Sequence, residues 1–336
     1  MAKDKMLILR FSALGDVAMT VPAVYSLARQ YPELDIYMAT TPFFARLFIN
    51  PPANVTVLPF DVKKEYRGVL GTFKLMRRLA AIKPDMVADL HNVGRSWAID
   101  FWMRLHGVKV HMVDKMRSGR DKVLKGKIAQ RNFVDRYADV FASLGYPIKL
   151  DFKTLFPEGK PAIPLTVNHP AVGLAPFARY YNKTYPLDKM KRVADALTEQ
   201  GVNVYLFGAR GSEAEQLGAW TPFNKRIHSL AGRFSLEEEL AIMANMDVMV
   251  SMDSANQHMG SLAGVPVVSL WGSTTPACGF MGYGQSAYNA LVAGIECQPC
   301  SIAGKPECPL GHLDCFGALS PEMIVSKIMS IIQKQG

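Results

Sequence analysis

Short apolar runs alternate with longer amphipathic runs along most of the chain. In the first half, five apolar runs predict strands at Met6–Phe11, Asp35–Ala39, Val55–Pro59, Met86–Leu90 and Val108–Val113. Amphipathic runs between them predict helices at Val17–Gln30, Thr72–Ile82 and Arg95–Leu105. Strands that alternate with helices in this way are typical of a parallel sheet with crossover helices.

The alternation stops at a proline-rich stretch, Phe156–Pro170, and then begins again. Further strands are predicted at Ala171–Pro176, Val202–Phe207, Ile227–Leu230, Val248–Ser251 and Val267–Leu270, with helices at Leu187–Gln200, Leu236–Asn245 and His258–Ala263. The pattern therefore predicts two Rossmann-like α/β domains, at 1–160 and 171–320, joined by a linker at 161–170. A final amphipathic helix at 321–336, capped by Ser320, is expected to pack back on the first domain.

Length and composition support this division. A chain of 336 residues is too long for one ordinary core, and 49% apolar with 20% charged residues is typical of a folded protein. No apolar run approaches the roughly 20 residues that span a bilayer, and the first residues lack a signal-peptide pattern. We therefore expect a cytoplasmic protein.

The net charge of +9 is carried by the first half, with a basic run between Lys109 and Arg136. This run is either a solvated basic loop or a segment that meets phosphorylated lipid or a membrane surface. A nucleic-acid partner is disfavoured, because the run has no interleaved aromatic residues on which bases would stack.

In open α/β sheets ligands bind at the carboxyl ends of the strands. The first strand is followed by the sequence from Arg10 to Asp16, which is not the Gly-x-Gly-x-x-Gly fingerprint of dinucleotide-binding enzymes. Gly15 permits a close backbone approach. Asp16 is then either a first-turn acid that the helix dipole favours or a general base that takes a proton from an attacking hydroxyl.

A stronger signal lies in the second half. A predicted buried strand ends at Asp253-Ser254, and small residues then open a helix whose free N–H groups favour an anion. The next strand ends in a second hydroxyl-rich turn, Gly272-Ser273-Thr274. Two such turns side by side suit a pyrophosphate, whereas His258 is as well explained by helix packing.

Together these segments resemble glycosyltransferase family 9, the heptosyltransferases of lipopolysaccharide core assembly. The resemblance is carried by Ser12-x-x-Gly15-Asp16 with Pro22, by Asn182-Lys183-Thr184-Tyr185-Pro186, and by Asp253-Ser254-x-x-x-His258 with Gly272-x-Thr274-x-Pro276. It implies a GT-B fold, in which two Rossmann-like domains face a cleft, and an inverting, metal-independent transfer that needs no cofactor. Because Asp16 and the donor segments lie in different predicted domains, we expect domain closure to be needed for the reaction. Asp16 would be the base, and Lys183 would contact the donor diphosphate. The chain departs from the family pattern at Ala255, where glycine is usual, and at Arg179, where neutral residues are usual.

On this interpretation the donor, expected to be ADP-heptose, is bound by Arg179, Lys183, Glu213, Asp253, Ser254, Ala255, His258, Gly272, Ser273 and Thr274. The acceptor, a phosphorylated lipid-linked saccharide of the inner core, is bound by Ser12, Gly15, His91, Arg95, Arg117 and Arg120. A peripheral position on the inner membrane surface follows from that acceptor. The alternatives are transfer from another nucleotide sugar, a sugar-nucleotide epimerase of the same fold, and a non-enzymatic polyanion- or lipid-binding protein.

Four of the five cysteines cluster near the C-terminus as Cys297, Cys300, Cys308 and Cys315. The spacing is compatible with a structural zinc site. Reduced thiols in a loop are the favoured alternative for a cytoplasmic protein.

Overall fold

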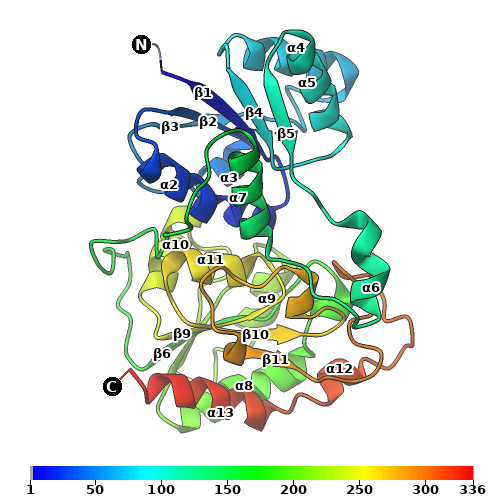
Figure 1. Ribbon diagram of the computed structural model, residues 1–336. Coiled ribbons are helices and arrows are strands. Elements are labelled where there is room, and N and C mark those ends of the chain that lie inside the picture. The colour runs from blue at the N-terminus through cyan, green and yellow to red at the C-terminus, as the bar shows by residue number, and fades with distance from the viewer. Residues whose placement is uncertain (1–2, 336) are drawn as a thin grey trace. The chain divides into compact units, whose positions relative to one another are not determined.

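A computed structural model describes residues 3–335 and divides the chain into two compact units. The first unit comprises the residues up to Arg117 together with Asn132–Lys153, and the second comprises Ser118–Arg131 and the residues from Thr154 onward. Both units are parallel α/β sheets covered by helices, as the sequence pattern predicts (Figure 1). No helix among residues 3–335 is both long and apolar enough to cross a bilayer.

The first unit contains a five-stranded parallel sheet in the order β3-β2-β1-β4-β5. Its strands are β1 (Lys5–Leu9), β2 (Asp35–Thr40), β3 (Val55–Pro59), β4 (Met86–Asp89) and β5 (Lys109–Met112). Its helices are α1 (Leu14–Ala18), α2 (Thr20–Gln30), α3 (Pro42–Ala45), α4 (Gly68–Ala80), α5 (Gly94–Leu105) and α7 (Phe133–Ser143). Helices α4 and α5 pack together on one face of the sheet, and α2 packs with α7 on the other (Figure 1).

The second unit contains a six-stranded parallel sheet in the order β11-β10-β9-β6-β7-β8. Its strands are β6 (Ala171–Ala175), β7 (Asn203–Leu206), β8 (Ile227–Ser229), β9 (Val248–Met252), β10 (Val267–Trp271) and β11 (Ala290–Val292). Its α-helices are α6 (Arg120–Leu124), α8 (Leu187–Glu199), α9 (Ser212–Gly218), α10 (Leu236–Ala244), α11 (Ala255–Ala263), α12 (Asp314–Gly317) and α13 (Pro321–Ile332). Short 3₁₀ helices occur at Arg117–Gly119, Tyr181–Lys183, Pro276–Cys278 and Ala287–Asn289.

The central strands are buried on both faces, which explains why they read as continuous apolar runs. In the first unit Leu7, Leu9 and Val87 meet Leu75 and Leu79 of α4. The register places Leu9 opposite both Ala39 and Asp89, so β1, β2 and β4 end at the same edge. Side chains that follow these strands therefore emerge together.

The C-terminal helix differs from expectation. Helix α13 packs beside α8 within the second unit, and Ile324 and Ile328 are buried in that unit's core. Its apolar face is covered there, together with Val193 and Leu197 of α8.

The basic run between Lys109 and Arg136 is not a single loop. It contains α6 and the start of α7, and it is divided between the two units after Arg117.

Candidate active site

Each sheet has one point at which the strand order reverses, and ligands bind preferentially at such points. In the first unit this point lies between β1 and β4. Asp16 follows β1 and His91 follows β4, so both residues lie at the reversal. The sheet order thus brings together two segments that are about 75 positions apart in the sequence.

Asp16 lies in the first turn of α1, where Arg10 and the backbone of Ala13 contact its carboxylate. Its Oδ1 is 2.6 Å from Nη2 of Arg10, and its Oδ2 accepts a hydrogen bond from the backbone N of Ala13 at 2.9 Å. Arg10 is buried and also donates to the backbone carbonyl of Leu90 at the end of β4. Burial alone would lower the pKa of Arg10, but neighbouring Tyr137 and Asp16 raise it above its usual value. The carboxylate is therefore fixed in orientation beside a permanent cation, while about a quarter of its side chain stays exposed.

His91 faces the same place from β4. Its Nε2 lies 3.2 Å from Oγ of Ser12, and its backbone N donates to Oδ1 of buried Asp89 at 2.8 Å. Burial and the nearby Arg10 lower the pKa of His91 to about 3, so the imidazole is neutral at physiological pH. The fold thus brings Ser12 and His91 together with Asp16.

Two further residues at this cluster were missed by sequence reasoning. Tyr137 of α7 is fully buried, and its hydroxyl has no hydrogen-bond partner within residues 3–335. Lys115 follows β5, and burial and the charge of Arg10 lower its pKa to about 8. Neither position lies in a sequence motif. The start of α7 could have been recognised from Asn132, the helix N-cap, whose side chain accepts a hydrogen bond from the backbone N of Val134.

The structure does not group all of the other predicted acceptor residues with this cluster. Gly15 lies in α1 next to Asp16. Arg117 donates to the carbonyl of Asn92 at 2.9 Å, and Arg95 donates to the carbonyl of Val62 at 3.0 Å, so both guanidinium groups brace the backbone. Arg120 opens α6 and belongs to the second unit, so the structure does not group it with the others.

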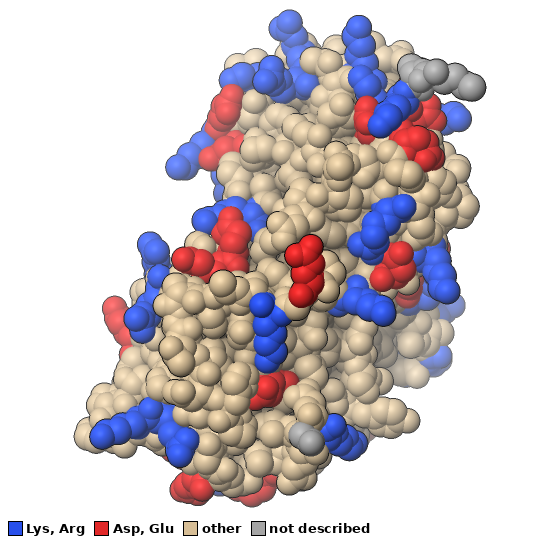
Figure 2. Space-filling model, turned by 90° about the vertical axis from the view of Figure 1, so that its left-hand side faces the viewer, with Lys and Arg blue, Asp and Glu red and all other residues tan. Residues whose placement is uncertain are grey.

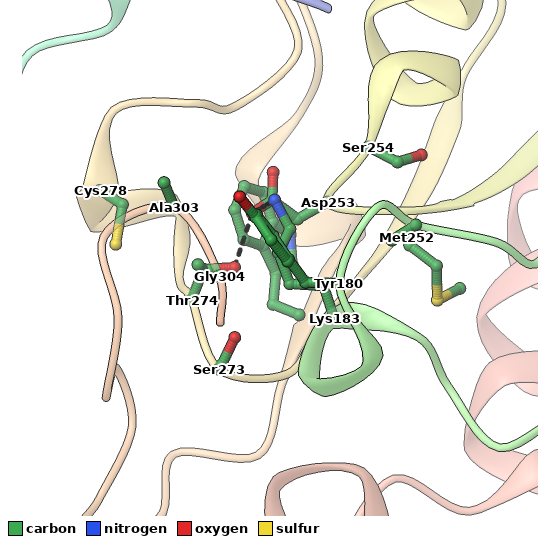
Figure 3. A network of polar contacts seen from close by, with 12 residues as sticks. Tyr180, Lys183, Met252, Asp253, Ser254, Ser273, Thr274, Cys278, Ala303 and Gly304 are labelled. Carbon is green, nitrogen blue, oxygen red and sulfur yellow. Dashed lines mark hydrogen bonds and ion pairs between the residues drawn. The ribbon is translucent and has the colours of Figure 1, made fainter. Parts of the chain in front are cut away.

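In the second unit the strand order reverses between β6 and β9. Lys183 follows β6 and Asp253 follows β9. Nζ of Lys183 lies 2.7 Å from Oδ2 of Asp253, and the two side chains are only 13% and 4% exposed. Thr274, which follows β10, donates its hydroxyl to the same carboxylate oxygen at 2.6 Å. Figure 3 shows these three side chains converging from three separate loops.

Neighbouring groups fix this centre. Gln257 donates to Oδ1 of Asp253 at 3.1 Å, and the backbone N of Ser273 donates to the carbonyl of Asn182 at 3.0 Å. A Cβ on Gly272 would collide with the ring of Phe316, so only glycine fits there. The buried hydroxyl of Ser273 has no hydrogen-bond partner among the described residues.

Helix α11 begins directly at this centre. Ser254 is its N-cap, with its Oγ 3.2 Å from Oγ of Ser251, and Ala255 is its first residue. The early N–H groups of a helix have no partner within the helix and favour an anion. His258 lies one turn along the same helix and is buried. The predicted cluster from Asp253 to His258 is therefore on one helix start, beside the Gly272–Thr274 turn.

The other two predicted donor-binding residues, Arg179 and Glu213, make contacts of their own. Arg179 is exposed, and its guanidinium stacks over the ring of Tyr180 at 5.3 Å. Glu213 lies in the first turn of α9 and accepts a hydrogen bond from the backbone N of Ala209 at 2.7 Å. One of its carboxylate oxygens thus holds the turn after β7. This turn lies at the same edge of the sheet as Lys183, Asp253 and Thr274.

The four clustered cysteines are reduced, with Cys315 buried and the other three half-buried. Burial raises the pKa of Cys315 to about 11, and Cys300, Cys297 and Cys308 add to that rise. Among residues 3–335 no three His, Cys, Asp or Glu side chains are placed to hold a metal ion.

The two centres have complementary chemistry. The second unit offers an ammonium group, hydroxyls and a helix start, which together stabilise a negatively charged diphosphate. The first unit offers an oriented carboxylate next to a neutral imidazole and several cations, a set suited to an anionic molecule that carries a nucleophilic hydroxyl.

Comparison with known proteins agrees with this chemistry. The family model described as glycosyltransferase family 9 (heptosyltransferase) matches residues 72–310. Lipopolysaccharide heptosyltransferase 1 of Pseudomonas aeruginosa is 24% identical over 98% of both chains. A family 9 glycosyltransferase of Veillonella parvula has a TM-score of 0.74 at 17% identity, covering 99% of this chain and 98% of that one. Escherichia coli heptosyltransferase WaaC with ADP-2-deoxy-2-fluoro heptose has a TM-score of 0.68 at 19% identity, covering 99% and 100%.

These neighbours confirm the GT-B fold, and the family match extends over most of the chain. The protein is a glycosyltransferase and belongs to glycosyltransferase family 9, the heptosyltransferase family.

Proposed function

We propose that this enzyme transfers heptose from ADP-heptose to a phosphorylated, lipid-linked saccharide of the lipopolysaccharide inner core. The observation that carries the donor assignment is the Lys183–Asp253–Thr274 centre at the start of α11. The WaaC complex supports the choice of donor, because that protein has a similar fold and was solved with a fluorinated ADP-heptose. Lipopolysaccharide heptosyltransferase 1 of P. aeruginosa supports the choice of acceptor.

The proposed reaction is a single displacement. An acceptor hydroxyl attacks C1 of the sugar, the new C1–O bond forms as the bond from C1 to the phosphate oxygen breaks, and the configuration at C1 inverts. Asp16 takes the hydroxyl proton, and its orientation by Arg10 and Ala13 supports this role. The leaving ADP carries the negative charge, which Lys183 and the N–H groups of α11 stabilise.

We propose that protein groups, with no metal ion, stabilise the leaving diphosphate. The centre holds one ammonium group and two hydroxyl-bearing turns within the same strand edge, which supplies the charge and donors that the step needs. Transfer is therefore expected to continue after treatment with EDTA. A zinc ion bound by the cysteine cluster remains a separate hypothesis that metal analysis of the purified protein can check.

The acceptor site is proposed for the first unit, around Ser12, His91 and Lys115. A lipid-linked acceptor would place the enzyme peripherally on the cytoplasmic face of the inner membrane. This position is a consequence of the proposed substrate.

The test is a transfer assay with extracted, heptose-free inner-core acceptor and a panel of nucleotide sugars, namely ADP-heptose, ADP-glucose, GDP-mannose and UDP-glucose. We expect a product heavier by one heptose with ADP-heptose only, and an inverted anomeric centre by NMR. Equal or faster transfer from a GDP- or UDP-sugar would replace the donor assignment. Retention of configuration would contradict the single displacement.

A further inference from the structure

The outer faces of α4 and α5 carry large apolar side chains that the fold does not bury. On α4, Val69 and Leu70 are each 86% exposed, while Leu75 and Leu79 of the same helix fill the core. Helix α4 is therefore apolar on two faces, and only the inner face is explained by folding. Contiguous exposed apolar surface of this kind marks an interaction site.

Helix α5 repeats the pattern. Trp97, Phe101 and Leu105 are spaced by four residues, so they lie on one side of the helix, and all three are exposed. Ile99 and Met103 point into the core instead. The helix thus presents an aromatic and aliphatic stripe outward along its length.

The two faces form one surface. Helices α4 and α5 pack side by side (Figure 1). The rings of Phe73 on α4 and Trp102 on α5 meet edge to face, with their centroids 5.7 Å apart. We refer to this surface as the α4–α5 apolar face. It is defined by the exposed residues Val69, Leu70, Phe73, Trp97, Phe101 and Leu105.

The exposed charges within α4 and α5 have one sign. The exposed charged residues within α4 and α5 are basic, namely Lys74, Arg77, Arg78 and Arg104. The one acidic residue of these two helices, Asp100, is buried. Lys74 is partly neutralised by Glu65 of the preceding loop, at 2.8 Å. On the face drawn in Figure 2, by contrast, positive and negative side chains are interspersed.

Apolar and aromatic groups surrounded by cations match the chemistry of an anionic bilayer. The apolar side chains enter the boundary of the acyl region, Trp settles at the headgroup level, and Lys and Arg meet lipid phosphates. A second copy of the face would set the cations against each other. The charge pattern therefore favours lipid.

The face also leads to the acceptor-side cluster. Nε1 of Trp97 donates to Oδ1 of Asn92 at 2.8 Å, and Arg117 stacks over the Trp97 ring while bonding the Asn92 carbonyl. Asn92 directly follows His91 in the chain. The stripe therefore begins at the turn that carries His91.

We propose that the α4–α5 apolar face docks on an anionic lipid bilayer and thereby brings a membrane-embedded acceptor to the His91 turn. The second part of this inference rests on the proposed function, whereas lipid binding does not. The surface differs from the exposed basic residues of 118–131, which belong to the second unit.

Vesicle flotation tests the docking. We expect the full-length protein to float with vesicles of phosphatidylethanolamine and phosphatidylglycerol and not with phosphatidylcholine alone. The double variant Phe101→Glu, Leu105→Glu should lose flotation. Arg77→Gln with Arg78→Gln should weaken vesicle binding about 25-fold, at roughly a factor of five per basic residue. Phe223→Glu, at an isolated exposed position of the second unit, is the matched control and should float normally.

Fluorescence gives a second measure that does not depend on activity. Brominated phosphatidylglycerol should quench the protein's tryptophan emission, and Trp97→Phe should remove most of that quenching. Flotation or quenching that the α4 and α5 variants leave unchanged would overturn the proposal. So would sedimentation showing that the wild type dimerises and that Phe101→Glu, Leu105→Glu makes it monomeric.

Activity assays separate this inference from the proposed function. The Phe101→Glu, Leu105→Glu variant should transfer sugar to a water-soluble, deacylated acceptor at the wild-type rate and to vesicle-embedded acceptor at least about tenfold more slowly. An equal loss on both acceptors would contradict docking as the role of this face. A wild type that binds vesicles but transfers to neither acceptor would refute the proposed function and leave docking supported.

Discussion

The ammonium of Lys183 lies 2.7 Å from the carboxylate of Asp253, in a nearly buried ion pair at the strand reversal of the second unit. Thr274 and Gln257 complete the contacts of that carboxylate. In the proposed function this lysine serves both the fold and the ligand. Asp253 holds the ammonium in place at the start of α11, where a diphosphate would meet it.

Replacement of Lys183 by Met should therefore have two separable effects. An unpaired buried carboxylate remains, so the free energy of unfolding should fall by about 3 kcal/mol, measured by urea denaturation. Adding Asp253→Asn should restore much of the stability, because the buried charge is removed, but not the affinity for ADP. As a control, Lys191→Met breaks the half-exposed Lys191–Asp195 pair and should cost less than about 1 kcal/mol. Normal ADP binding by the double variant would contradict the donor role of Lys183.

Loss of the charge on Lys115 should lower kcat/KM at alkaline pH. Its pKa is lowered to about 8 by burial and by Arg10, so it loses its charge as the pH rises through 8. Binding of a phosphorylated acceptor, and with it kcat/KM, should then decline above this pH. Lys115→Arg keeps the charge and should move the decline to higher pH, whereas Lys122→Met on exposed α6 should leave the profile unchanged. If kcat/KM of Lys115→Arg declined at the same pH as that of the wild type, Lys115 would not be the cause of the decline.

The buried carboxyl of Asp100 should make stability depend on pH. Burial and the neighbouring Asp89 raise its pKa to about 8. Because the folded state keeps a proton that the unfolded state loses near pH 4, this stabilisation is complete below pH 4 and is lost as the pH rises through 8. His91 acts in the opposite direction between pH 3 and 6.5, since its folded pKa is about 3. The effect of Asp100 is therefore clearest between pH 6.5 and 8.

Asp100→Asn is the variant that measures this effect. Its amide can still donate to Asp89 but does not titrate, so the fall in unfolding free energy between pH 6.5 and 8 should be smaller than in the wild type. Urea denaturation at both pH values gives the comparison, and groups elsewhere cancel in the difference. The same fall in both proteins would show that Asp100 is not the titrating group.

Much of the fold could be predicted from the sequence because parallel strands buried on both faces leave long apolar signals. The apolar pattern predicted the ends of each strand from β1 to β10 to within about two residues. The residue types in the turns indicated Asp253 and Gly272–Thr274 as candidate site residues. Strand β11 was missed because it is short and only half-buried. Helix α7 was missed because the basic residues before it masked its start at Phe133.

Contacts between distant segments lay beyond the sequence pattern. The Lys183–Asp253 pair joins two loops that meet only because β6 and β9 are neighbours in the sheet. Arg10 lies close to Asp16 in the chain, yet Tyr137 of α7 is also its neighbour in the fold. A residue such as Tyr137 carries no local signal of function, so only the fold reveals its place.

The central claim is that Asp16 activates the acceptor while the second unit holds the donor. Asp16→Asn tests it most directly, because the amide keeps the size of the carboxylate but takes no proton. We measure the rise in melting temperature with ADP and the single-turnover rate from ADP-heptose to deacylated inner core, in wild type and variant. The account predicts the same ADP-induced rise and a transfer rate lower by about 10²–10⁴. Near-normal transfer by Asp16→Asn would contradict it.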